Sequence, residues 1–142
     1  MQSTVYRIIA LQNDETDCRV INTLFNRAEF DLTTFDNGRE FIKYMRMQPC
    51  PDCLITDLEL DETAGIEVIE RIRRDARWQS VPIIVLAPSV DKSTLVKLSQ
   101  LKIKGYIVRP YQPQRLFNEV LSAMGLEVVT QKTAVKRVKT KP

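Results

Sequence analysis

Apolar and polar positions divide this chain into two kinds of segment that alternate along it. Short runs rich in aliphatic and aromatic residues, too short to be helices, predict buried strands. These runs lie at residues 5–11, 30–35, 53–57, 81–86 and 106–108. Longer segments whose apolar residues recur every three or four positions predict a helix after each strand.

Each predicted helix has one apolar face, and several have a recognisable end. Thr16 or Asp17 can cap the first helix, Asp91 lies near the start of the fourth, and Gly125 closes the fifth. The apolar faces consist of Val20, Ile21, Leu24 and Phe25; Phe41, Ile42 and Met45; Ile66, Val68, Ile69 and Ile72; Leu95, Val96 and Leu98; and Leu116, Phe117, Val120, Leu121 and Met124. Because crossovers between parallel strands are short and right-handed, five such units predict an α/β fold. We expect a single parallel sheet of order 2-1-3-4-5 with helices on both faces.

A single acidic residue, Asp57, ends the third predicted strand. In an open α/β sheet, ligands and chemistry collect at the carboxyl ends of the strands. A metal site there would need further oxygen ligands, mostly carboxylates, at the neighbouring strand ends. Those ends carry Gln12 and Asn13, Ala87 and Arg109 instead. One acid among amides and an arginine differs from an ordinary magnesium site.

Length and charge favour one domain with a distinct tail. The 142 residues suit one domain at residues 1–125. Residues 126–142 form a basic tail, expected either to extend the last helix or to be disordered. From residue 127 this tail carries five cationic residues against one acid, so the remainder is nearly neutral. Nucleic acid is therefore not expected as a partner except through the tail.

No segment predicts export or membrane insertion. No apolar run approaches the roughly 20 residues that span a bilayer, and no secretory signal is visible, so we expect a cytoplasmic protein without a membrane partner. Cys50 and Cys53 have the spacing of a redox or zinc pair. The chain has no histidine to complete a zinc site, and the pair leads into a strand rather than a helix. Reduced thiols are expected.

Several motifs in this order resemble the receiver domain of bacterial two-component response regulators, over roughly residues 5–124. They are Asp57 at the end of strand three, Gly65-Ile66-Glu67 eight positions later, the strand at residues 82–86, and Gly105-Tyr106-Ile107-Val108 followed by a basic residue and Pro110. The resemblance implies a flavodoxin-like (βα)5 fold. It also implies a role in phosphorelay signal transduction, with a histidine kinase or an output protein as partner.

The resemblance places Asp57 at the position that accepts a phosphoryl group, but the positions around it depart from the family pattern. The two acids that help to hold magnesium in receivers correspond to Gln12 and Asn13, with Asp14 one step late. The hydroxyl residue after strand four corresponds to Ala87, and the lysine before the proline of strand five to Arg109. Asp57 thus keeps the acceptor position without its usual helpers.

We therefore expect magnesium to bind weakly or not at all, and no other cofactor. If an ion binds, its ligands would come from Asn13, Asp14, Asp57 and Glu59. Losing even ~3 kcal/mol of charge attraction lowers affinity about a hundredfold. Arg109 is always charged, and one hypothesis is that it pairs with Asp57 in place of the ion. The alternative is that Arg109 extends to solvent and Asp57 is merely hydrated.

Tyr106 is a second candidate residue. In family members that signal through an aromatic residue on strand five, the ring turns inward when the hydroxyl residue after strand four moves. Because Ala87 cannot make that contact but leaves space, we predict that the Tyr106 ring is packed inward whether or not phosphate is present. The alternative is an ordinary half-exposed tyrosine. A partner surface is expected around Lys92, Leu95, Tyr106 and Gln112.

Three functions remain open at this point. The first is a receiver-like module, not an enzyme, that acts mainly through protein–protein contacts with impaired phosphotransfer, in other words a pseudo-receiver. The second is a functional phospho-receiver, phosphorylated on Asp57 by a histidine kinase. The third is a flavodoxin-like cofactor binder or small enzyme, which would need a phosphate-binding loop after strand one. Residues 12–16 offer one hydroxyl and two acids there, and the acids repel phosphate.

Overall fold

Five parallel strands form the centre of the molecule in the computed structural model, which describes residues 4–60, 62–129 and 134–137. The strands are β1 (Tyr6–Leu11), β2 (Phe30–Phe35), β3 (Cys53–Asp57), β4 (Ile83–Ala87) and β5 (Gly105–Val108). Their order in the sheet is β2-β1-β3-β4-β5, so the predicted fold class and strand order are confirmed. β3 and β4 are buried along their whole length, as expected for strands covered on both faces.

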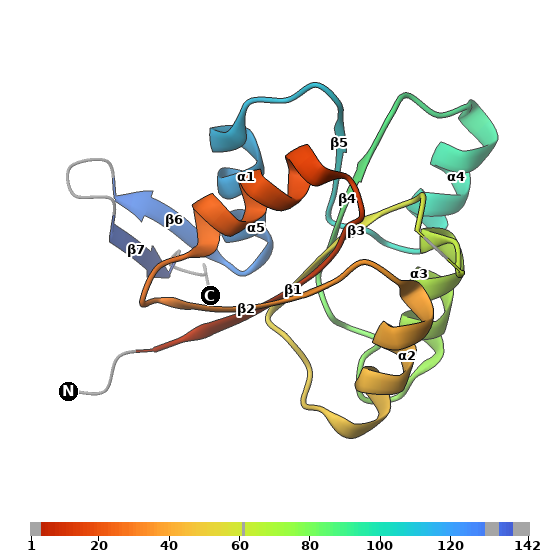
Figure 1. The fold of residues 1–142 in the computed structure, drawn as a ribbon, viewed down its shortest axis with the longest axis horizontal. Coiled ribbons are helices and arrows are strands. Elements are labelled where there is room, and N and C mark those ends of the chain that lie inside the picture. Colours follow the sequence, from red (N-terminus) through yellow and green to blue (C-terminus); the bar gives the residue numbers. More distant parts are fainter. Residues whose placement is uncertain (1–3, 61, 130–133, 138–142) are drawn as a thin grey trace, which may run out of the picture.

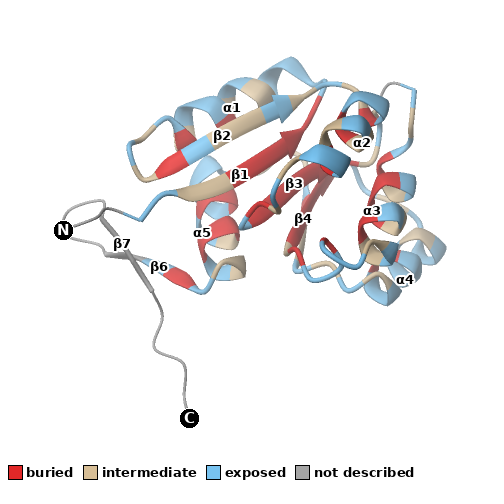
Figure 2. Ribbon diagram, turned by 90° about the horizontal axis from the view of Figure 1, so that it is seen from below, coloured by how far each residue is buried: buried red, intermediate tan, exposed pale blue. Residues whose placement is uncertain are grey.

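Helices cover both faces of the sheet (Figure 1). One layer consists of α1 (Glu15–Phe25) and α5 (Pro113–Ala123), and the other of α2 (Gly38–Met47), α3 (Gly65–Arg74) and α4 (Lys92–Gln100). Strand side chains alternate between two apolar cores because successive Cβ atoms point to opposite faces. Ile8 and Ala10 join the core under α1 and α5, whereas Ile9 and Leu11 join the core under the other three helices. Figure 2 shows the buried strands between the two layers.

Several element boundaries differ by one or two residues from the sequence-based expectation, and two of the differences have a clear physical reason. β4 begins at Ile83 rather than at residue 81, because Pro82 has no N–H to donate to a ladder and contributes its carbonyl to Leu54 N instead (2.9 Å). The cap of α1 is Asp14, whose carboxylate accepts the backbone N–H of Asp17 at 2.9 Å. The expectation that Thr16 or Asp17 caps this helix is therefore wrong. The carboxylate of Asp17 therefore takes no part in capping α1.

The tail differs most from expectation. β6 (Leu126–Val129) and β7 (Ala134–Arg137) pair as an antiparallel ladder rather than as the helical extension that was one of the two expectations for this tail. Gly125 ends α5 with a positive φ of 74°, and the β-branched residues that follow favour extended backbone. Leu126 is buried in the core under α1 and α5. Residues 130–133 and 138–142 of the predicted tail lie outside the described residues.

The cysteines are free thiols. Cys50 donates its S–H to the carbonyl of Arg77, and Cys53 is fully buried in β3. Burial raises the pKa of Cys53 to about 12, which keeps this thiol protonated and unreactive near neutral pH. In the part of the chain that the structure describes, no helix has both the length and the apolar character needed to cross a bilayer.

Candidate functional site at the carboxyl end of the sheet

Asp57 lies at the end of β3 with both carboxylate oxygens engaged. The residue is only 4% exposed. One oxygen, Oδ1, accepts the backbone N–H of Glu59 at 2.9 Å, and the other, Oδ2, accepts from Nη2 of Arg109. A buried carboxylate needs such partners, because an unpaired buried charge is costly. The predicted pairing of Arg109 with Asp57 is present.

Arg109 also binds a second carboxylate, that of Asp17 on α1. Its Nε donates to Asp17 Oδ2 at 2.6 Å, and Nη2 approaches the same oxygen at 2.5 Å. The side chains of Asp17 and Asp57 are 4% and 5% exposed, and that of Arg109 is 23% exposed. One guanidinium thus bridges two buried acids that come from α1 and β3.

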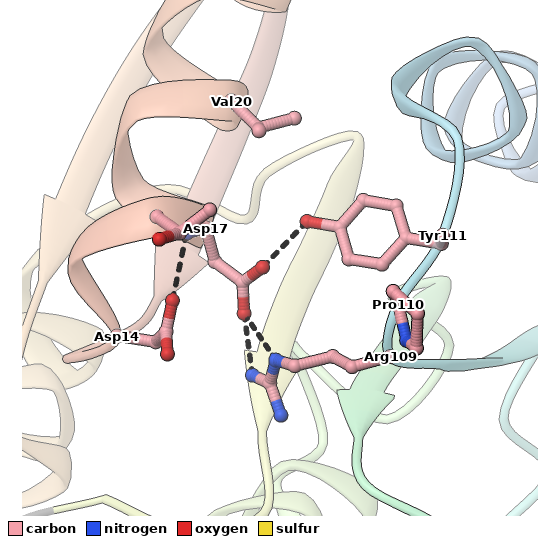
Figure 3. A pocket seen from close by; sticks show the side chains of 7 residues that line it. Asp14, Asp17, Val20, Arg109, Pro110 and Tyr111 are labelled. Carbon is pink, nitrogen blue, oxygen red and sulfur yellow. Dashed lines mark hydrogen bonds and ion pairs between the residues drawn. The ribbon is translucent and has the colours of Figure 1, made fainter.

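Tyr111 completes this arrangement, which we call the Asp17–Arg109–Asp57 cluster. Its hydroxyl donates to the remaining oxygen of Asp17, Oδ1, at 2.7 Å. Figure 3 shows Arg109 and Tyr111 reaching from the segment after β5 towards Asp17 on α1. Burial, followed by the bond to Asp17, raises the pKa of Tyr111 above its usual value. Partial burial of Arg109 opposes its charge, but its bonds to Asp17 and Asp57 outweigh this effect and raise its pKa.

A cavity of about 370 Å³ adjoins the cluster between α1 and the segment after β5. Its lining residues are Asp14, Thr16, Asp17, Val20, Arg109, Pro110 and Tyr111. The charged groups of Asp17 and Arg109 are bonded to each other at this wall, as Figure 3 shows. The charged residues of its lining are thus an internally paired acid and base, Asp17 and Arg109, and the helix-capping Asp14.

The other candidate residues, at the ends of the strands that neighbour Asp57, carry no charge. Gln12 directly follows β1 and is 3% exposed, and neither polar atom of its side-chain amide makes a hydrogen bond within the described residues. Asn13 is exposed, and Ala87 is buried at the end of β4. Ala87 accepts the backbone N–H of Arg109 at 3.1 Å, which fixes the start of the arginine beside the strand end.

Candidate metal ligands do not converge on Asp57. The carboxylate of Asp14 is used in capping α1. Glu59 is exposed and contacts Asp57 through its backbone N–H rather than its carboxylate. Among the described residues, no three acidic, cysteine or histidine side chains are placed to hold a metal ion. The acid that shares Arg109 with Asp57 is Asp17, and both of its carboxylate oxygens are already bonded.

Gly65 explains the fixed spacing after Asp57. A Cβ at this position would lie 2.1 Å from the backbone oxygen of Asp57, closer than any real contact. The Gly65 N–H donates to the carbonyl of Leu58 at 3.0 Å, which closes the loop onto the start of α3. Only glycine lets the helix begin this close to the strand end.

Tyr106 lies between the two arrangements considered for it. Its ring packs against the core under α2, α3 and α4, yet the residue is half-buried rather than enclosed. Its hydroxyl donates to the carbonyl of Pro88 at 2.7 Å, which ties the ring to the segment after β4. The ring therefore has one bonded position in this structure. Its independence from phosphate stays a prediction.

Sequence reasoning missed Asp17 and Tyr111. A signal for Asp17 was present, because it precedes Val20 by three positions and Ile21 by four and so shares their apolar face of the helix. An acid on an apolar face is expected to be buried and paired. Tyr111 has no comparable signal, since it follows Pro110 in a loop whose path the pattern does not define.

Comparison with known proteins shows the family of this chain. The family model of the response regulator receiver domain matches residues 8–121, which is most of the chain. The chain belongs to the response regulator receiver domain family. As in two-component signalling proteins generally, the receiver domain is the signalling module that histidine kinases and output proteins engage.

Relatives of this receiver domain include both large and small proteins. It is 27% identical over 124 residues to the hybrid signal transduction histidine kinase D of Dictyostelium discoideum. This match covers 87% of this chain but only 8% of that protein. It is 25% identical over 120 residues to the chemotaxis protein CheY1 of Helicobacter pylori, covering 84% and 97% of the two chains.

A solved structure with the same fold is the receiver domain of sensor histidine kinase PA1611 from Pseudomonas aeruginosa. The TM-score is 0.74 at 18% identity, and the match covers 86% of this chain and 99% of that one. That domain has a magnesium ion coordinated in its active site cleft. At this identity the likeness concerns the fold alone.

Proposed function

We propose that this receiver domain is a cytoplasmic pseudo-receiver that signals mainly through protein–protein contacts. In it, Asp57 occupies the phosphoacceptor position but is held in an ion pair by Arg109. The observation that carries the proposal is the bridging of Asp17 and Asp57 by one guanidinium. A permanent positive charge then takes over the charge balancing that a divalent cation performs in other receivers.

The donor set around Asp57 does not fit a magnesium ion. Magnesium requires oxygen ligands in a nearly octahedral arrangement at short distance. Gln12 and Asn13 have neutral amides at the positions where negatively charged carboxylates would bind the cation most strongly. A cation would also have to displace Arg109 from Asp57. At ~4 Å and an effective dielectric near 20, each unit charge pair contributes about 4 kcal/mol before desolvation. Even a fraction of this loss lowers affinity about a hundredfold.

Phosphoryl transfer depends on groups that neutralise the developing negative charge. Ala87 supplies no hydroxyl donor, and Arg109 is already bonded to two carboxylates. We infer that modification of Asp57 is slow.

A second candidate, a functional phospho-receiver modified on Asp57 by a histidine kinase, is favoured by one observation. Arg109 contacts Asp57, and a guanidinium can also bind phosphoryl oxygens with two hydrogen bonds.

The surface for protein contacts is the face formed by α4, β5 and α5. Leu95, Val96 and Val108 are 43%, 48% and 39% exposed there. Large exposed apolar residues on neighbouring elements are typical of a protein-binding surface. Tyr106 lies on the same face. Its hydroxyl donates to the carbonyl of Pro88, and this hydrogen bond holds the ring in one position. Signalling proteins, either a kinase or an output protein, are the expected partners.

The test compares the wild type with two variants. The double variant carries Gln12→Asp and Asn13→Asp, and the triple variant carries Arg109→Lys as well. Each is titrated with magnesium while tyrosine fluorescence is recorded, and is then incubated with a small acyl phosphate and magnesium. We expect the triple variant to bind magnesium about a hundredfold more tightly than the wild type. This corresponds to ~3 kcal/mol of restored charge attraction, because ~1.4 kcal/mol changes affinity tenfold. Intact mass should show phosphate on the triple variant and little on the wild type.

Asp57→Asn in each background is the control that assigns any added mass to Asp57. The double variant separates the missing carboxylates from the effect of Arg109. If the wild type is phosphorylated on Asp57 as fast as the triple variant, the pseudo-receiver proposal fails and the phospho-receiver reading stands.

A further inference from the structure

A second candidate site is a cleft between α2 and α3. These two helices lie next to each other on the sheet face opposite α1 and α5 (Figure 1). The cleft has a volume of about 260 Å³. Its lining residues are Ile42, Met45, Arg46, Arg71, Arg74 and Asp75. We call it the α2–α3 cleft.

Three arginines converge on this cleft from two helices. Arg46 belongs to the last turn of α2, and Arg71 and Arg74 belong to the last turn of α3. All three are exposed, and none forms an ion pair with an acid in the described part of the chain. The single acid of the cleft, Asp75, uses Oδ1 to accept the backbone N–H groups of Arg77 and Trp78. The cleft therefore has a surplus of positive charge.

Three other exposed arginines of the domain have acidic neighbours, and a fourth, Arg77, donates to the backbone carbonyls of Met45 and Arg46. Arg19 lies 3.5 Å from Glu15, Arg39 lies 3.8 Å from Glu62, and Arg115 lies 4.0 Å from Glu119. Favourable interaction with the helix dipole accounts for cations in the last turn of one helix. It does not account for arginines from two helices surrounding the same hollow.

The floor of the cleft is apolar. Ile42 is half-buried and Met45 is 6% exposed, and both belong to the α2 face that packs on the core. The hollow is smaller than the roughly 300–1,000 Å³ of pockets that enclose whole small ligands. It suits one aliphatic side chain with charged groups around it. Methionine adapts to such a side chain more readily than a branched residue.

We propose that the α2–α3 cleft binds an acidic segment of a partner protein. An aliphatic side chain of that segment enters the hollow over Ile42 and Met45, and its carboxylates pair with the arginines. Guanidinium groups suit this role because they bind carboxylates with two parallel hydrogen bonds. The cleft shares no residue with the Asp17–Arg109–Asp57 cluster, so the proposal is independent of whether Asp57 is modified.

A protein segment fits this surface better than nucleic acid. No aromatic side chain lines the cleft to stack on a base. Glu40 on α2 and Glu67 on α3 are both exposed, and they would repel a phosphate backbone running along either helix. A short segment with a few carboxylates can contact the arginines without meeting these acids.

The test measures binding of a fluorescein-labelled peptide, in which one leucine is flanked on each side by two glutamates, by fluorescence anisotropy on the full chain. The decisive variant is Arg46→Glu combined with Arg74→Glu. Its matched control is Arg19→Glu combined with Arg115→Glu, which changes the net charge equally on the opposite face of the sheet. We expect the first variant to bind at least about tenfold more weakly and the control to bind like the wild type.

Two further probes test the chemistry of the occupant. A peptide with serine in place of leucine should bind several-fold more weakly, and a ten-nucleotide oligothymidylate should not compete. Emission from Trp78, which is fully buried and packs on Phe41 of α2, verifies that each variant is folded. The proposal is overturned by no peptide binding to the wild type at millimolar concentration, by equal losses in the two double variants, by equal affinity for the serine peptide, or by effective competition from the oligonucleotide.

Discussion

Arginine serves opposite purposes in two regions of this receiver domain. In the Asp17–Arg109–Asp57 cluster, one guanidinium is shared by two carboxylates that are almost fully buried. In the α2–α3 cleft, three exposed arginines surround a hollow with no acid paired to them in the described residues. The first region has more acid than base, and the second has more base than acid.

Burial explains the difference. A charge removed from water must find a partner inside the molecule, so Arg109 and its two acids constrain one another and belong to the fold. An exposed arginine is solvated and needs no internal partner, so its charge stays available to another molecule. An arginine that is paired internally is therefore expected to matter for stability, and an exposed unpaired arginine for binding.

The largest effect should come from removing Arg109. Arg109→Ala leaves Asp17 and Asp57 buried without a cation, and we expect a loss of about 2–4 kcal/mol, somewhat below a fully buried pair because Arg109 is partly exposed. Arg74→Ala in the cleft should change stability by no more than about 0.5 kcal/mol. Urea denaturation followed by Trp78 fluorescence measures both. Equal effects of the two variants would remove the contrast between the regions.

Tyr111 provides a finer test of the buried cluster. Tyr111→Phe removes a hydrogen bond to the charged Asp17, which at this partly buried site should cost about 1–2 kcal/mol of unfolding free energy at neutral pH. Because burial and the bond to Asp17 raise the pKa of Tyr111, the folded state favours its protonated form. That contribution is complete below about pH 10 and is lost as pH rises further.

The difference in stability between wild type and Tyr111→Phe should therefore shrink above about pH 10. Denaturation curves at a series of pH values measure it. Tyr6→Phe is the matched control, since Tyr6 lies on β1 and packs on Phe30 rather than on an acid. If the stability difference between wild type and Tyr111→Phe stayed constant up to pH 11, the bond between Tyr111 and Asp17 would not contribute to stability as proposed.

Gln12 should give the smallest effect, with the opposite sign. Its buried amide has no hydrogen-bond partner among the described residues, although it directly follows β1 beside the strand that ends at Asp57. Replacing such a group by an apolar one of similar shape avoids a desolvation cost, so Gln12→Met should raise stability by about 1 kcal/mol. Thermal unfolding measures this change. Gln114→Met, at an exposed position, is the control; a destabilised Gln12→Met would show that the amide is satisfied.

The pattern of apolar residues was sufficient for the fold. The short continuous apolar run Ile83–Ala87 is typical of a buried strand, and the apolar residues of α3 recur with helical spacing. Both patterns depend on local geometry alone. The strand order follows from general rules on crossovers. The prediction failed in the tail, where the valines after Gly125 were compatible with either backbone and the structure has a β-ladder. Local preference alone does not decide such a short segment.

The candidate site divides in the same way. The sequence by itself determined that Asp57 ends a buried strand, and that amides, an alanine and an arginine stand at the neighbouring strand ends, because each position is fixed by its own strand. It also raised the pairing of Arg109 with Asp57 without deciding it, since the reach of a long side chain depends on what else surrounds it. Only the tertiary structure decided that Asp17 and Tyr111 join this arginine, and that arginines of α2 and α3 share one cleft. These contacts join residues up to 94 positions apart, and their formation depends on how the elements pack rather than on any local pattern.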